Sequence, residues 1–171
     1  MTMRDPKQEK SSSAFLPAVM AAWLAYLAVD FLTHAVLLAS WWTANAASFL
    51  PPMELFSRIP FAYLSFLFYC AALVWLLQRL LGARPALGAS LRLAAWAGLA
   101  AGVVTALGNY SVFAMPPSAL IVWPVSMLAG TLAAGAAASS VLSVERPWRR
   151  LLLVFLAALG ILVLGVLLQN L

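Results

Sequence analysis

Long apolar segments alternate with short polar ones along this chain. Apolar runs cover residues 17–40, 59–81, 93–115, 119–142 and 151–168, and each is long enough for a helix to cross a hydrocarbon core of about 30 Å. Pro and Gly mark the short connections between them. Because the backbone polar groups of such segments must be satisfied within the membrane, the pattern predicts an all-α bundle of five transmembrane helices.

The first 13 residues depart from this pattern. They are polar and carry three basic side chains, so we expect a solvated tail over residues 1–13 and a single transmembrane domain over residues 14–171. A cleaved secretory signal peptide is the competing interpretation, with residues 44–46 as the cleavage site. The first apolar run is longer than the apolar region of a signal peptide and contains Asp30 and His34, which favours a retained span.

Composition agrees with a membrane protein. Hydrophobic residues make up 65% of the chain and charged residues 9%, whereas soluble domains contain about 25% charged residues. The net charge of +5 comes from basic residues in short clusters between apolar runs, which indicates topology control and not nucleic-acid binding. The single cysteine, Cys70, lies within an apolar run, which excludes a disulfide framework within the chain. The lipid bilayer is therefore the first partner that the sequence predicts.

Lysine and arginine alternate between the connections. The tail, the connection after the second span and the connection after the fourth span hold nine of the ten basic residues, and Arg58 is the tenth. By the positive-inside rule, the N-terminus is cytoplasmic and the C-terminus is extracytoplasmic.

Small residues recur at steps of four in the third and fourth spans. The third span carries Ala94, Gly98, Gly102 and Ala106, and the fourth carries Ser126, Gly130, Ala134 and Ala138. Such stripes allow close approach of helix backbones in lipid. We expect Gly98, Gly102, Gly130 and Ala134 to pack these two spans together as a hairpin. The alternative is that one stripe is the face of a homodimer.

Asp30 and His34 are the ionisable residues within the first span, and such groups cost about 2.5 to 3.5 kcal/mol at the centre of a membrane helix unless paired or hydrated. Their spacing of four places them on one helix face, with Tyr26 and Thr33 close to that face and Trp41 farther along it. They are therefore the first candidates for a ligand or partner site.

Polar residues collect in the outer half of the predicted bundle. This half contains Asp30, His34, Tyr63, Ser65, Tyr69, Thr105, Asn109 and Ser126. The inner half is mostly Ala, Leu and Gly, which argues against a channel or proton path across one chain. We expect an outward-facing pocket covered by the connection 41–58, in which Glu54 and Arg58 form a surface ion pair.

The sequence allows two other interpretations of Asp30. In the first, Asp30 pairs with His34 or Asn109 and holds the bundle together. In the second, Asp30 binds a metal with His34 and Glu54, although the signal for a metal is weak. The sequence contains no phosphate-binding loop, nucleophile elbow or HExxH motif, and its one histidine excludes a bis-histidine haem within one chain. We therefore expect no enzyme activity, no catalytic residues, no metal site and no cofactor.

Residues 29–54 run from Val29-Asp30-Phe31-Leu32-Thr33-His34 to Pro51-Pro52-Met53-Glu54. This stretch resembles the opening of a group of small uncharacterised bacterial polytopic inner-membrane proteins, which have a histidine near the outer end of the first helix and a Pro-containing acidic loop after it. The chain lacks the tyrosine and basic loop residues of that group. The resemblance implies a multi-pass protein of a bacterial inner membrane and no particular activity.

Together these features predict a non-enzymatic accessory or ligand-sensing membrane component. Tyr26, Asp30, Thr33, His34, Glu54, Tyr63 and Asn109 are the predicted site residues. A membrane-protein partner or a second copy of the chain is the expected macromolecular partner. The alternative is a small oligomeric transporter of an ion or small solute, because five helices leave no paired inverted repeat within one chain.

Overall fold

The structure is a computed structural model that describes residues 6–170, with side chains described for residues 14–51 and 53–170. Its long helices are α1 (Pro6–Phe31), α3 (Pro52–Leu81), α4 (Leu87–Val112), α5 (Ala119–Leu142) and α6 (Pro147–Gln169). A π-helix (Leu32–Leu37), the short helix α2 (Ala39–Ala44) and a 3-10 turn (Ala46–Ser48) lie between α1 and α3. The prediction of an all-α bundle with five helices long and apolar enough to cross a membrane is confirmed.

The observed helices extend beyond several predicted spans. α1 begins at Pro6, so much of the expected tail is helical, and residues 1–5 lie outside the described part. α3 begins at Pro52 and α4 at Leu87, both earlier than predicted. Proline is favoured in the first turn of a helix, which agrees with the start of α3 at Pro52. α4 follows directly after Ala86, whose backbone is extended. The connection 41–58, which the sequence predicts to cover the pocket, is largely helical, since α2 and the first turns of α3 occupy most of it.

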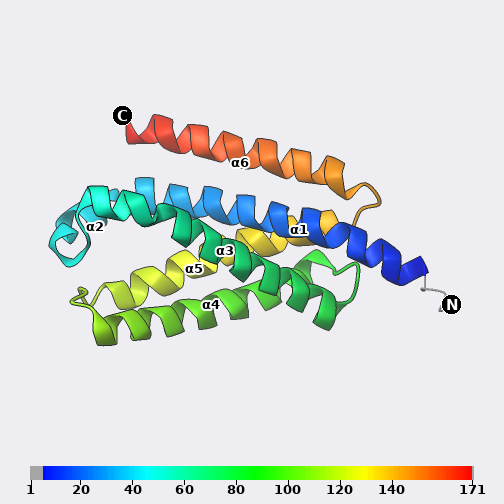
Figure 1. Cartoon of the computed structure of the whole chain (residues 1–171), viewed down its shortest axis with the longest axis horizontal. Helices are drawn as coiled ribbons and strands as arrows, with labels where there is room; N and C mark the ends of the chain where they lie inside the picture. Colours follow the sequence, from blue (N-terminus) through cyan, green and yellow to red (C-terminus); the bar gives the residue numbers. More distant parts are fainter. Residues whose placement is uncertain (1–5, 171) are drawn as a thin grey trace.

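The five long helices lie side by side along the bundle (Figure 1). α5 is central and makes its most extensive contacts with α4 and then α1, whereas α6 lies on the far side of α1 from α4. α1 begins and α6 ends at opposite ends of the bundle. We call the end that holds α2 and the α4–α5 turn the α2 end, and the other the arginine end.

The buried core fills the half of the bundle toward the arginine end. It is formed by the first turns of the span in α1, by the second half of α3 and by the last turns of α5, with these members: Ala18, Val19, Ala21, Ala22, Tyr26, Cys70, Leu73, Val74, Leu77, Ala134, Ala137, Ala138, Val141 and Leu142. Ser139 and Ser143 donate hydrogen bonds to the carbonyl of Pro85, at 3.0 and 3.3 Å, and fasten the α3–α4 connection to α5. This half is closely packed.

The small residues of α4 pack against α5. Ala94, Gly98, Gly102 and Ala106 are all buried. A Cβ atom at Gly102 would lie 2.5 Å from Cα of Pro124, and one at Gly98 would lie 2.8 Å from Cβ of Thr131. Only glycine permits backbones to approach this closely.

The stripe of α5 does not face α4 as a whole. A Cβ atom at Gly130 would meet the ring of Tyr26 on α1 at 2.8 Å, and Ala134 belongs to the core that α5 shares with α1 and α3. The face that α5 turns toward α4 instead includes Pro124, Met127 and Thr131. The expected hairpin of the two spans is confirmed, because α4 and α5 form the most extensive contact and Gly98 and Gly102 lie in it. Gly130 of the α5 stripe instead serves the α1–α5 contact.

Candidate functional site

A cavity of about 470 Å³ lies between α1, α3, α4 and α5 in the half toward the α2 end. Its lining comes from all four helices and from the π-helix: Tyr26, Asp30, His34, Ser65, Phe66, Tyr69, Ala101, Val104, Thr105, Trp123, Ser126 and Met127. Ligand pockets usually have volumes of about 300 to 1,000 Å³ and are mostly apolar with a few polar groups, as this one is.

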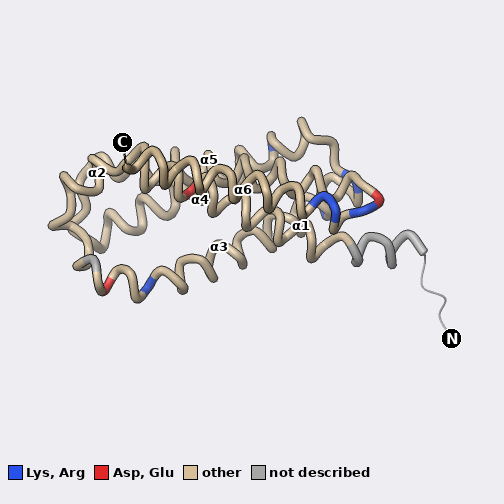
Figure 2. Tube along the Cα trace, turned by 90° about the horizontal axis from the view of Figure 1, so that it is seen from above, with Lys and Arg blue, Asp and Glu red and all other residues tan. Residues whose placement is uncertain are grey.

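The cavity exists because α3 diverges from the other helices. Cys70, Leu73, Val74 and Leu77 in its second half are buried in the core, whereas Phe61 and Leu64 in its first half are exposed. Figure 2 shows α3 separating from the rest of the bundle toward its N-terminal end. One cross-helix hydrogen bond restrains this region, from Nε1 of Trp23 on α1 to the carbonyl of Tyr63 at 2.9 Å.

His34 links Asp30 to Trp42. Nε1 of Trp42 donates to Nδ1 of His34 at 3.1 Å, and Nε2 of His34 lies 3.5 Å from Oδ1 of Asp30. A ring nitrogen that accepts a hydrogen bond carries no proton, so a neutral His34 must carry its proton on Nε2, facing Asp30. Trp42 thereby fixes the tautomer in which the imidazole can donate to the carboxylate.

The π-helix makes the contact with Trp42 possible. The amide of Leu38 donates to the carbonyl of Thr33 at 2.8 Å, which is the five-residue spacing of a π-helix. The extra residue in each turn brings Trp42, eight positions after His34, onto the face of His34. A regular α-helix predicts Trp41 on that face, and that prediction is wrong. From α6, Nε2 of Gln169 donates to the carbonyl of Ala35 at 2.8 Å and fastens the π-helix to the bundle.

Aromatic rings line two sides of the cavity. The Tyr26 ring lies 4.7 Å from that of Phe66 and 6.0 Å from that of Tyr69, measured between centroids. The hydroxyl of Tyr26 donates to Sδ of Met127, and the Tyr69 hydroxyl bonds Oγ1 of Thr131, both at 2.9 Å. These bonds connect α1 and α3 to α5 and hold the rings in place.

An aromatic cluster lies beside the cavity at the α2 end. Trp123 of α5 contacts the rings of Trp41, Trp42 and Phe49 at centroid distances of 5.9 to 6.3 Å. Trp41 also donates to Oγ of Ser118 at 2.9 Å, which ties α2 to the start of α5. The segment after the first span is thus packed on α5.

Ser126 is a buried polar residue of the cavity whose hydroxyl has no partner among the described residues. Its side chain is only 6% exposed. Since a buried hydroxyl without a partner costs about 1 to 3 kcal/mol, the group is suited to a ligand or water in the cavity.

The structure brings together part of the predicted site. Tyr26, Asp30 and His34 line the cavity, whereas Thr33, Glu54, Tyr63 and Asn109 do not. Glu54 lies in the first turn of α3, and Tyr63 contributes only its backbone carbonyl, to Trp23. Asn109 makes no side-chain bond to Asp30 within the described residues, because Asp30 pairs with His34.

The sequence did not predict five residues that line the cavity: Phe66, Ala101, Val104, Trp123 and Met127. Ser65, Tyr69, Thr105 and Ser126 were predicted only as polar residues of the outer half. A signal was present, since Ser65 and Tyr69 are four residues apart and share a face with Phe66. Trp123 and Met127 have the same spacing on α5.

Two charged arrangements differ from expectation. Within residues 14–51 and 53–170, the contact of Asp30 with His34 is the only one of a carboxylate with a basic side chain, so the expected pair between Glu54 and Arg58 is absent. Both side chains are exposed in water or at an interface, where such a pair contributes little. In the same part of the chain, no group of three His, Cys, Asp or Glu side chains is placed to hold a metal ion.

Comparisons of the sequence with family models and with curated proteins, and of the chain with solved structures, found no match.

Proposed function

We propose that this chain is a non-enzymatic multi-pass protein of a bacterial inner membrane that senses a small ligand, or assists a partner, through a cavity open to the extracytoplasmic side. The cavity between α1, α3, α4 and α5 is the observation that carries this proposal. It combines a membrane-embedded carboxylate, a histidine held in one tautomer and an unpartnered hydroxyl in one space.

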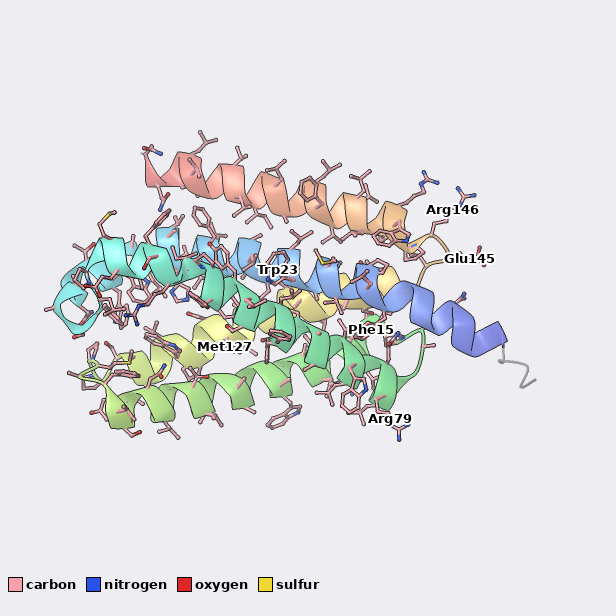
Figure 3. All side chains as sticks on the ribbon, viewed as in Figure 1. Phe15, Trp23, Arg79, Met127, Glu145 and Arg146 are labelled. Atoms are coloured by element: carbon pink, nitrogen blue, oxygen red, sulfur yellow. The ribbon has the colours of Figure 1, made fainter. Side chains whose placement is uncertain are left out.

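Charge distribution supports the orientation. Arg79 lies in the last turn of α3, Arg84 in the following connection and Arg92 near the start of α4. Arg146 directly precedes α6, and Arg149 and Arg150 lie in its first turn. Figure 2 shows these basic residues at the arginine end, and Figure 3 places Arg79, Glu145 and Arg146 there, with Met127 toward the α2 end. The positive-inside rule then makes the arginine end cytoplasmic and turns the cavity outward.

Close packing of the arginine half supports sensing over transport. Core residues from α1, α3 and α5, such as Ala22, Leu77 and Val141, fill the space between the cavity and the arginine end. A transport path needs polar or hydrated positions across the whole membrane, and this half offers few. A ligand at Asp30 would instead act on His34 and Trp42, and so on α2 at the membrane surface.

Side-specific cysteine labelling tests this proposal. Cys70 is the only cysteine, so Cys70→Ala removes all thiols from the chain. In that background, Thr105→Cys in the cavity should react with a membrane-impermeant thiol reagent added outside. Leu107→Cys, on the exposed face of the same helix two residues away, is the matched control and should not react because it faces lipid.

Cysteines in the inner half of the bundle test for a transport path. Ala133→Cys and Leu156→Cys should resist aqueous reagents from either side under the sensing proposal. Reaction of Ala133→Cys with reagent added from the cytoplasm would contradict that proposal and favour the small oligomeric transporter.

A further inference from the structure

The charge of the cavity restricts the ligands that it can hold. Asp30 is the only carboxylate among the described residues that line it, and no Lys or Arg lines it. His34 faces Asp30 at 3.5 Å but holds a hydrogen bond from Trp42 at its other nitrogen, which favours the neutral ring. An ionised Asp30 is therefore left without a full positive counter-charge in a low-dielectric site, a state that is costly inside a membrane.

The walls of the cavity suit a cation with an apolar body. Tyr26, Phe66, Tyr69 and Trp123 line it, and aromatic faces attract a cation within about 6 Å of the ring centre. Ala101, Val104 and Met127 provide apolar surface on α4 and α5. A volume of about 470 Å³ accommodates a small organic molecule and is larger than a dehydrated inorganic ion needs.

Ser126 provides an independent polar contact for such a ligand. Ser126 is 94% buried, its hydroxyl has no partner among the described residues, and it lines the same cavity as Asp30. A protonated amine in the cavity has N–H donors for the carboxylate and for this hydroxyl. A quaternary onium ion lacks these donors and is attracted by the carboxylate charge and the aromatic rings alone. The same site disfavours anions, because the described arginines lie at the far end or on the surface near Glu54.

From these observations we infer that the cavity binds a lipophilic organic monocation, an amine or quaternary onium compound, with Asp30 as its counter-ion and Tyr26, Phe66, Tyr69 and Trp123 around its charge. This inference rests on the proposed function and names its ligand class. The two proposals can fail separately, because the proposed function needs only an open cavity, whereas this inference also specifies the charge of the ligand.

Binding of tetraphenylphosphonium to the whole chain in nanodiscs of zwitterionic phosphatidylcholine tests the inference. The chain should bind it saturably. Tetraphenylborate, which has the same four-ring shape and the opposite charge, should show no saturable binding when it is added alone in a separate measurement. Asp30→Asn should lower the affinity by about ten-fold or more, because it removes the charge and keeps a hydrogen-bond acceptor for His34. Glu54→Gln removes a carboxylate outside the cavity and should change the affinity by less than about two-fold.

A second pair of variants leaves Asp30 in place. Ser65 is exposed and lines the cavity, so Ser65→Lys adds a competing ammonium group and should weaken binding of the phosphonium, whereas Ser65→Gln, of similar length and no charge, should not. The inference is overturned if the wild-type chain shows no saturable binding, if Asp30→Asn and Glu54→Gln act equally, or if the two Ser65 variants act equally.

Labelling of Thr105→Cys separates the two proposals. A cavity that reacts with the thiol reagent but binds no phosphonium contradicts the cationic ligand and leaves the sensing cavity standing. A cavity that does neither contradicts both proposals.

Discussion

His34 occupies a position at which a single hydrogen bond decides the direction of another. Because Trp42 donates to Nδ1, the proton of the neutral ring lies on Nε2 and points to Asp30. Without that donor the ring is free to adopt either tautomer, and in one of them a lone pair faces the carboxylate. Trp42 thus acts on the cavity although it does not line it.

The tautomer of His34 can be observed directly, since it is the only histidine in the chain. We predict that ¹⁵N-histidine labelling of protein purified without a polyhistidine tag shows Nε2 protonated and Nδ1 unprotonated. Trp42→Phe keeps an aromatic ring but removes the donor, and it should give a mixture of tautomers. Trp41→Phe, which removes a donor to Ser118 instead, is the matched control and should leave the wild-type signal. A wild-type ring protonated on Nδ1 would contradict this arrangement.

The residues of the site could be predicted only in part, for a physical reason. Asp30 and His34 stand out because ionisable groups are rare in apolar spans. Trp42 does not stand out, because a helix with regular geometry places Trp41 on the face of His34. The local sequence did not predict the π-helix. Phe66 and Met127 look like ordinary apolar residues of a span, and only the divergence of α3 shows that they line a cavity.

Among the elements, α4 and α5 form the most extensive contact, and glycine on α4 sets their distance. The same step-of-four pattern on α5 serves a different neighbour, α1, where Gly130 accommodates the ring of Tyr26. The pattern of small residues indicates close packing, but it does not specify the partner. The sequence prediction took the neighbouring span as the partner of each stripe. This is correct for the stripe of α4, which packs on α5, and wrong for Gly130 of α5, which packs on α1.

The α4–α5 contact gives a prediction about stability. Gly102→Ala places a Cβ atom 2.5 Å from Cα of Pro124, and because backbone must move to relieve this contact, we expect a loss of about 1 to 3 kcal/mol in the free energy of unfolding. Gly108→Ala, on the same helix, meets nothing within 4 Å and should be neutral or stabilise by up to about 1 kcal/mol through helix propensity. Unfolding in mixed micelles measures both. Equal stabilities of the two variants would contradict the close contact.

At the scale of the whole molecule, the two halves of the bundle differ in packing. Toward the arginine end, α1, α3 and α5 share a closely packed core of mostly small and aliphatic side chains. Toward the α2 end, α3 separates and leaves the cavity, and the aromatic cluster around Trp123 lies beside it. The polar residues that the sequence places in one half of the spans include several that line this space.

The number of long apolar helices could be predicted because hydrocarbon imposes a simple rule on length and polarity. The divergence of α3 could not, because it depends on which of its residues find partners across the bundle. Cys70 and Leu77 find them, whereas Phe61 and Leu64 face outward. An apolar residue facing lipid and one facing protein look alike in sequence, since both surroundings are apolar.

Everything proposed for the cavity depends on which side of the membrane it faces. A reporter fused after Leu171 measures this most directly, with alkaline phosphatase active only outside the cytoplasm and green fluorescent protein fluorescent only inside it. Five crossings with a cytoplasmic N-terminus predict an active phosphatase fusion and a dark fluorescent fusion at this position, and the reverse for fusions at Met1. A fluorescent protein that is bright at both ends would place both termini in the cytoplasm and contradict the outward-facing cavity.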